Sequence, residues 1–363
     1  MGSMFDAIKS MPAKVCLCLS FLIGILYSIN FIFFSSCSVV NGEGCFDLIS
    51  NGAAPEDEAY GRGAGTLYVA GVLMFGVITG NLLILNEGAR GKWSIMLPTI
   101  AGFTCLAIVL APPFQGDYES ANNTPLYATL AALGLYIGAY VMLKEEGVDE
   151  GLAFNMGIKI ENEAKYAIIV SSIIGTLYSL NHFFFADSYA GAGGSSLIPG
   201  FEDGSYWEGH EAYSPIAAAP IAYRVLASFF VVFVSMGLIL LTNGAKGNWP
   251  AAHVLLFGIT FFALSVIIGN VAVNDQIIPE GDNAGTWEAD TSTVTANIAV
   301  SAFVMLLNIF AYYKMREEGV EEGMTFGGED FGNSDDFFYK MYPAVTAGFV
   351  VLLLIANYVT QVQ

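Results

Sequence analysis

Long apolar segments recur along the chain, separated by short polar stretches. We find nine such segments, at 14–34, 66–86, 93–112, 125–143, 165–185, 221–242, 249–271, 294–313 and 341–360. A helix needs about 20 apolar residues to cross the roughly 30 Å hydrocarbon core of a bilayer, and these segments have that length. A transmembrane barrel would show shorter segments of alternating character. The pattern therefore predicts an all-α polytopic membrane protein with nine spans.

Three sequence landmarks occur twice, in the same order. The segment Leu26–Phe34 resembles Leu177–Phe185, and Gly88–Trp93 resembles Gly244–Trp249. The third pair is Glu145–Gly151 and Glu317–Gly323. A shared order at offsets of roughly 150 to 170 residues indicates a duplicated module. We therefore predict two parallel four-helix transmembrane repeats plus a ninth transmembrane helix.

The duplication divides the chain into four parts. These are a cytosolic N-terminus at 1–13, the first four-span repeat at 14–157, the second at 158–328, and a linker with the ninth helix at 329–363. Because each repeat has an even number of spans, both enter the membrane in the same orientation. We expect a pseudo-twofold axis along the membrane normal, unlike the in-plane axis of inverted-repeat transporters.

Asparagines recur near one end of three predicted spans. Asn30 and Asn181 each follow a lysine by sixteen residues, and Asn357 follows one by seventeen, so the ninth span resembles a further copy of the first. Amides inside a membrane commonly form hydrogen bonds between helices, each contributing about 1 kcal/mol. The alternative is that these three side chains lie near the outer mouth of a path. No Asp, Glu, Lys or Arg clearly occupies mid-bilayer depth, which argues against proton-coupled transport and voltage sensing.

Lysine and arginine residues indicate how the chain is oriented. If nine spans alternate, all of these residues except Arg62 and Arg224 fall on the side of the N-terminus. Basic residues are enriched in cytoplasmic loops. We expect an integral membrane protein with a cytosolic N-terminus and an exoplasmic or lumenal C-terminus, in an organelle that the sequence does not identify.

The charge balance constrains the partners. The chain has 55% apolar and 13% charged residues and a net charge of −20, and its acidic residues are concentrated in the predicted outer loops. An acidic surface repels polyanions, so nucleic acid is not an expected partner. The loops would attract cations or a basic partner, or they reflect adaptation to a saline environment.

The cysteines do not form a disulfide scaffold. Cys37 and Cys45 lie in the first outer loop, where an oxidising compartment would join them in a local disulfide. The other three cysteines fall inside predicted spans, where a thiol usually serves as a small apolar side chain.

Each repeat contains a glycine-rich turn and an acidic segment. Two glycines permit a tight reversal in Gly88–Trp93 and Gly244–Trp249, and we interpret Trp93 and Trp249 as anchors at the headgroup level. The acidic segments follow the fourth span of each repeat, where Gly147 and Gly319 can cap the preceding helix. We interpret these segments as exposed linkers; binding of a divalent cation or a basic partner is the alternative.

Candidate catalytic and metal sites are scarce. The three histidines form no pair with metal-ligand spacing. An acidic loop with Glu280, Asp282, Glu288 and Asp290 partly resembles a calcium loop, but it lacks the acidic fifth position and the closing glutamate. These four residues are weak candidates for a low-affinity cation site. We predict no enzyme and no cofactor, and bound lipids or divalent cations are the ligands that the sequence leaves open.

The layout of each repeat, with four spans and a long first outer loop, resembles that of tetraspan proteins such as claudins and tetraspanins. The resemblance covers topology only, because both the claudin signature Trp…Gly-Leu-Trp…Cys…Cys and the tetraspanin Cys-Cys-Gly are absent.

The sequence favours a non-enzymatic structural or assembly protein. It would act as a scaffold or an accessory subunit of a larger membrane complex, contacting lipids and other membrane subunits, or itself, through its acidic outer loops. The alternative is a channel or facilitative transporter with a path between the two repeats. The mild polar interior and the duplicated modules suit the first interpretation.

Overall fold

The structure is a computed structural model. It describes residues 6–34, 60–114, 123–153, 157–186, 218–272, 276–277, 286–287, 291–326, 329–330 and 337–362. Its main helices are α1 (Met11–Phe33), α3 (Tyr60–Glu87), α4 (Trp93–Val109), α5 (Thr124–Leu143), α6 (Ala164–Phe184), α8 (Ala218–Asn243), α9 (Trp249–Ala272), α10 (Thr291–Glu317) and α12 (Tyr342–Val362).

Short elements complete the described chain. The 3₁₀ turns η1 and η2 cover Pro112–Phe114 and Lys144–Glu146, and a π-helical turn, η4, covers Phe337–Met341 directly before α12. Four two-residue strands form two antiparallel pairs. Strand β1 (Gln276–Ile277) pairs with β2 (Thr286–Trp287), and β3 (Thr325–Phe326) pairs with β4 (Glu329–Asp330).

Local sequence explains where several helices begin. The hydroxyl of Ser10 accepts a hydrogen bond from the Ala13 N–H and so caps the start of α1. Pro12 lies in the first turn of α1 and Pro125 in that of α5. Proline suits this position because its missing N–H would have no partner inside the helix.

Eight of the nine predicted spans correspond to helices long and apolar enough to cross a membrane. This confirms an all-helical fold typical of a multi-pass membrane protein. The prediction for 93–112 was wrong in its length. The helix there, α4, has 17 residues and ends at Val109. Pro112 and Pro113 follow at once, and proline cannot continue a helix because it lacks the N–H and restricts the preceding residue.

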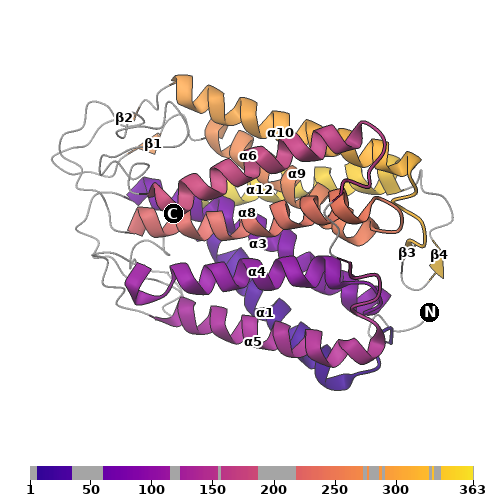
Figure 1. The fold of residues 1–363 in the computed structure, drawn as a ribbon. Coiled ribbons are helices and arrows are strands. Elements are labelled where there is room, and N and C mark those ends of the chain that lie inside the picture. The colour runs from indigo at the N-terminus through magenta and orange to yellow at the C-terminus, as the bar shows by residue number, and fades with distance from the viewer. Residues whose placement is uncertain are drawn as a thin grey trace.

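The helices form a bundle with α3, α8 and α9 at its centre (Figure 1). Most residues of these three spans are buried, whereas only 17–28% of the residues are buried in the spans formed by α5, α6, α10 and α12. An apolar helix that is buried on all sides belongs to a core, and the exposed apolar sides of the outer helices suit contact with lipid. The core therefore runs through the middle of the bundle.

The same helix contacts occur in both halves of the chain. In the first half α1 packs against α3 and α5, and in the second half α6 packs against α8 and α10. Between the halves α4 packs against α8, and α9 packs against α3. Glycines at these contacts bring the backbones together: a Cβ atom on Gly76 would lie only 3.0 Å from the Cα of Gly258.

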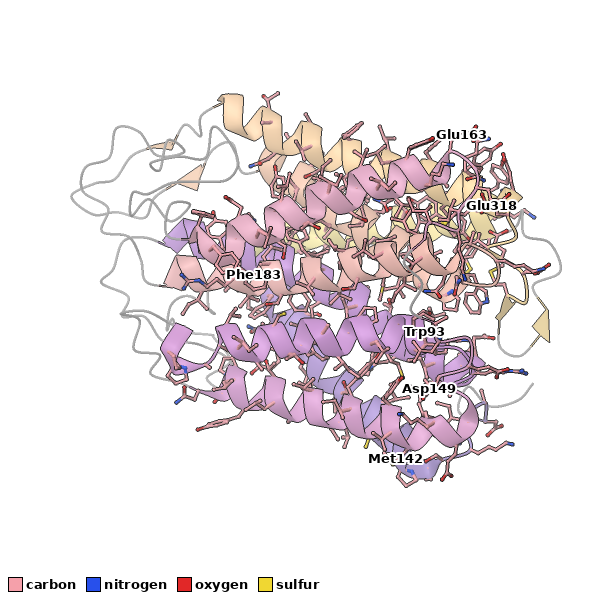
Figure 2. The ribbon with its side chains drawn as sticks, in the orientation of Figure 1. Trp93, Met142, Asp149, Glu163, Phe183 and Glu318 are labelled. Atoms are coloured by element: carbon pink, nitrogen blue, oxygen red, sulfur yellow. The ribbon has the colours of Figure 1, made fainter. Side chains whose placement is uncertain are left out.

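The two ends of the bundle differ in character. Figure 2 shows Trp93, Asp149 and Glu318 at one end, with Phe183 at the other. We call the first the turn end, because it contains both glycine-rich turns, and the second the loop end. Backbone hydrogen bonds at the turn end join Gly91 to Gly147 and Lys159 to Leu241. The lysine-rich connections therefore gather at this end, as the alternation of spans predicts.

Candidate functional site: a buried polar cluster at the turn end

The two glycine-rich turns have nearly identical backbones. Gly88 and Gly244 have φ of +87° and +88°, and Gly91 and Gly247 have φ of +68° and +69°. Positive φ is costly for a residue with a Cβ atom, so these four glycines are required for the turn. The predicted tight reversal is confirmed at both places.

Each turn is tied to the acidic segment of its own half. The N–H of Gly91 donates to the carbonyl of Gly147, over 2.9 Å, and that of Gly247 donates to the carbonyl of Gly319, over 3.0 Å. Both acceptor glycines have positive φ. The expectation that they cap the preceding helix is confirmed at Gly147, where η2 ends in a left-handed residue.

Ion pairs reinforce the same contacts. Arg90 pairs with Glu150, and Lys246 pairs with Glu322 over 3.1 Å. The hydrogen bond from Arg90 lowers the pKa of the Glu150 carboxyl, and the hydrogen bond to Glu150 raises the pKa of Arg90. All four side chains are well exposed, so water screens these pairs strongly.

Two further carboxylates of the acidic segments cap the first helix of each half. Glu146 accepts hydrogen bonds from the backbone N–H groups of Lys9 and Ser10, over 2.9 and 2.7 Å. Glu318 accepts them from Glu161 and Asn162, over 3.0 and 2.7 Å. These carboxylates therefore hold helix starts, and no set of described residues groups three or more metal-ligating side chains.

A chain of polar side chains lies buried at the turn end of the second half. His253 Nε2 lies 2.7 Å from the hydroxyl of Tyr312, and that hydroxyl donates to Glu321 Oε1 over 2.8 Å. Arg316 Nε donates to the other oxygen of Glu321 over 3.1 Å, with only 12% and 6% of the two side chains exposed. We call these four residues the polar cluster.

Hydrogen-bond chemistry determines the direction of this chain. An ionised carboxylate can only accept, so the one hydroxyl proton of Tyr312 goes to Glu321. The hydroxyl oxygen must then accept from His253, which places the imidazole proton on Nε2. His253 therefore donates to Tyr312, and Tyr312 donates to Glu321.

Aromatic residues of η4 cover the polar cluster. The ring of Phe337 stacks on the imidazole of His253, with centroids 3.9 Å apart and 6° between the planes. Phe338 stacks on Tyr312 with centroids 5.7 Å apart, and the guanidinium of Arg316 lies 5.4 Å from the ring centroids of Phe338 and Tyr339. The segment that starts α12 thus closes the cluster on its outer side.

The polar cluster also reaches the first half of the chain. The Trp249 ring lies beside His253, with centroids 5.3 Å apart, and the ammonium of Lys92 lies 5.2 Å from the centroid of Trp249. Burial lowers the pKa of Lys92, and nearby Glu87 partly offsets this. A cation over the face of a tryptophan is attracted by the ring quadrupole. Lys92 therefore links the turn of one half to the cluster of the other.

The tryptophans interpreted as membrane anchors are buried within the chain. Trp93 and Trp249 are 5% and 4% exposed. The indole N–H of Trp93 donates to the carbonyl of Glu150 over 3.1 Å, and Trp249 lies under Lys92. Both rings hold the glycine-rich turns against neighbouring segments.

The first half has only part of this cluster, because Tyr140 and Asp149 form a side-chain hydrogen bond but no histidine joins them. Aligning the two glycine-rich turns pairs His253 with Leu97, which has no polar side chain. Aligning the two acidic segments pairs Arg316 with Lys144, which lies 3.6 Å from Asp149. More than a third of each of these two side chains is exposed. The buried arrangement is thus particular to the second half, where η4 covers it.

The polar cluster joins three helical segments. His253 belongs to α9, Tyr312 and Arg316 belong to α10, and Phe337 precedes α12. Both ends of the hydrogen-bonded chain are closed, because Phe337 covers His253 and Arg316 binds Glu321. A buried network with every member satisfied makes a structure rigid and specific.

The structure places two of the three recurring asparagines in the core. Asn30 and Asn181 are 3% and 0% exposed. They lie on α1 and α6, which pack against different helices. Asn357 lies in α12, but its side chain is outside the described part of the structure.

Several predicted residues lie outside the described residues. These are the disulfide pair Cys37 and Cys45 and the cation-site candidates Glu280, Asp282, Glu288 and Asp290.

The sequence interpretation missed the polar cluster. It noted only that the three histidines form no pair with metal-ligand spacing and gave His253 no partner. The available signal was a histidine near the start of one apolar helix, together with Tyr312 and Arg316 near the end of the next, followed closely by Glu321. Comparisons with protein-family models, with curated proteins and with solved structures find no match for this chain.

Proposed function

We propose that this protein is a non-enzymatic integral membrane scaffold, or an accessory subunit of a larger membrane complex. The observation that carries the proposal is that polar side chains in the spans join helices of the same chain. His253 bonds α9 to α10, and a 2.7 Å hydrogen bond between Thr260 and Tyr342 joins α9 to α12. Asn308 Nδ2 donates to the Ser171 hydroxyl over 2.8 Å, which joins α10 to α6.

Close packing between the halves favours this function over a channel or facilitative transporter. A path between the repeats would pass along the contacts of α3 with α8 and α9 and of α4 with α8. There Gly76 faces Gly258, and Val232, Phe233 and Met236 are fully buried or nearly so. A core packed to this density leaves little room for a solute.

The proposal includes an internal duplication of a four-helix module, with α12 added. Its support is the recurrence of the same turns, the same carboxylate caps and the same helix contacts in both halves. An approximate twofold axis along the membrane normal relates two such modules of equal orientation.

The proposed orientation places the turn end in the cytosol and the loop end outside or in a lumen. The lysine-rich connections at the turn end support it through the positive-inside rule. The acidic loops, which lie outside the described residues, would then mediate contacts with other subunits on the exoplasmic side.

Native mass and flux together test the function. After purification in a mild detergent we expect a large, stable assembly, and reconstituted vesicles should show no selective flux. Asn30→Leu and Asn181→Leu should lower stability by about 1 kcal/mol per site, because each loses an amide that can bond between helices. A small oligomer whose selective flux disappears in well-folded Asn181→Leu would refute the scaffold and favour the transporter.

A further inference from the structure

Three buried polar side chains of the first half have atoms without a hydrogen-bond partner among the described residues. These atoms are Ser20 Oγ of α1, Asn81 Oδ1 of α3 and the hydroxyl oxygen of Tyr136 of α5. At most 1% of each residue is exposed. A buried polar group without a partner is costly, and in native proteins such groups usually bind ordered water or another ligand. The three atoms therefore need a partner that the described side chains do not supply.

Ser20 differs from several other hydroxyl side chains of the spans. Thr104, Thr176 and Thr242 each donate to the carbonyl four residues earlier in their own helix. This bond is common for serine and threonine in membrane helices. Ser20 does not form it. Its hydroxyl is therefore available to a group that lies between α1 and the neighbouring helices.

The packing of α1 on α3 places Ser20 beside Asn81. Asn81 Nδ2 donates to the carbonyl of Leu17 over 3.4 Å, and Ser20 lies one turn further along the same buried side of α1. One more turn along, a Cβ atom on Gly24 would lie only 2.5 Å from the side chain of Ile78, which precedes Asn81 by one turn. Ser20 thus lies between two contacts of α1 with the same stretch of α3.

The second half indicates that the positions of Ser20 and Tyr136 also face each other. The repeated landmarks pair Ser20 with Ser171 on the first helices of the two halves, and Tyr136 with Asn308 on the fourth helices. Asn308 Nδ2 donates to the Ser171 hydroxyl over 2.8 Å. The helix pairs correspond, because α1 packs on α5 as α6 packs on α10. This step rests on the proposed duplication, and it brings the three atoms to one level of the bundle.

The longer side chain of Tyr136 explains why the first half lacks the direct bond. Its ring packs edge-on against Phe103 of α4, with centroids 6.2 Å apart. Its hydroxyl lies beside Thr99 of α4 but makes no direct hydrogen bond. Thr99 donates its own proton to the carbonyl of Ile95 over 2.9 Å, so its oxygen can still accept. The phenol therefore reaches past Ser20 toward α4 and leaves the serine hydroxyl without a direct partner.

We propose that one ordered water molecule binds between α1, α3, α4 and α5 and connects these helices. It accepts hydrogen bonds from the hydroxyls of Ser20 and Tyr136, and it donates to Asn81 Oδ1 and to the hydroxyl oxygen of Thr99. Two donors and two acceptors match what a single water can bind, and buried waters typically make about two to four such bonds. All four groups are uncharged, whereas Ca²⁺ takes about six to eight oxygen ligands that include carboxylates.

A crystal structure of the full chain, grown from a lipidic mesophase, tests the proposal directly. We expect density for one water within hydrogen-bond distance of Ser20 Oγ, Asn81 Oδ1 and the Tyr136 hydroxyl. Direct hydrogen bonds among these side chains with no water between them would overturn the proposal. So would an anomalous signal at this place after exchange into a rubidium salt, because it would identify a monovalent cation as the ligand.

Removal of single hydroxyls tests the same bonds by the sign of the effect. Deleting a hydroxyl that binds water should destabilise the protein, whereas deleting one that has no partner should be neutral or stabilising. We expect Tyr136→Phe and Ser20→Ala each to lower the midpoint of thermal unfolding by about 2 °C. The double variant should lose less than the sum, because both changes act through one water.

Tyr127→Phe is the matched control for the tyrosine, because Tyr127 lies on the same helix and is exposed. This substitution should leave the unfolding midpoint unchanged. An unchanged or raised midpoint in Tyr136→Phe would overturn the proposal, as would strict additivity in the double variant.

Failure of the water site is distinguishable from failure of the proposed function. Native mass and vesicle flux do not depend on the water, so a crystal structure without it would leave the scaffold proposal standing. A crystal structure that placed Ser20 and Tyr136 at different levels of the bundle would overturn the water site and contradict the duplication as well.

Discussion

The ring of Phe337 lies parallel to the imidazole of His253, although the two residues belong to different helical segments. The contact brings the start of α12 onto α9, and it lies directly above the hydrogen bond from His253 to Tyr312. The contact that closes the polar cluster therefore also holds the start of α12 on α9. Disturbing one should disturb the other.

Loss of the Phe337 ring should loosen α12. Phe337→Leu keeps the apolar bulk but removes the stacking on His253, and we expect a loss of about 1 kcal/mol of unfolding free energy. Protease cleavage between α10 and α12 should become faster. Phe310→Leu, at an exposed position of α10, is the control and should change neither quantity. Equal effects of the two substitutions would show that the stacking contributes nothing specific.

Removing one charge of the polar cluster should be more costly than removing its counterpart in the first half. Glu321→Gln removes the carboxylate that pairs with the buried Arg316 guanidinium, and we expect a loss of roughly 3 kcal/mol. Asp149→Asn disrupts an exposed pair with Lys144 and should cost less than about 1 kcal/mol.

The double variant Arg316→Met with Glu321→Gln tests the reason for that difference. It removes both charges of the Arg316–Glu321 pair and should recover part of the lost stability, since neither charge of the pair stays buried without the other. Thermal unfolding of the unaltered protein, Glu321→Gln, Asp149→Asn and the double variant in one detergent gives the comparison. A double variant less stable than Glu321→Gln would show that the charge pair is not the cause.

The fold was largely predictable from the sequence, and the polar cluster was not. Runs of apolar residues long enough to cross a membrane predict the helices, and glycines at fixed spacing predict the turns at Gly88 and Gly244. Pro112 and Pro113 also predict the early end of α4. By contrast, the contact of Phe337 with His253 depends on where α12 packs, which no local pattern determines. The same holds for Lys92 on Trp249, which joins the two halves.

The Arg90–Glu150 pair should respond to pH in one direction. Because the pKa of Glu150 is lowered in the folded protein, its contribution is complete above the unfolded pKa of about 4.3 and is lost as the pH falls through the folded pKa. A double-mutant cycle with Arg90→Ala and Glu150→Gln should therefore show coupling at neutral pH and none in strong acid. Added salt should weaken the coupling at neutral pH, because both side chains are exposed. Coupling that persists in strong acid would contradict an ionic origin.

Glycines at the contact between the halves should tolerate no methyl group, whereas glycines on the outer surface should. A methyl on Gly258 would overlap the Phe233 ring, so Gly258→Ala should cost about 1–3 kcal/mol through overpacking. Gly134, in the middle of α5, has no atom within 4 Å of an added Cβ. Gly134→Ala should thus be neutral or stabilise the helix by up to about 1 kcal/mol, because alanine has the higher helix propensity. Thermal unfolding of both variants in the same detergent gives the comparison, and a Gly258→Ala protein as stable as Gly134→Ala would mean that α8 and α9 are not closely packed there.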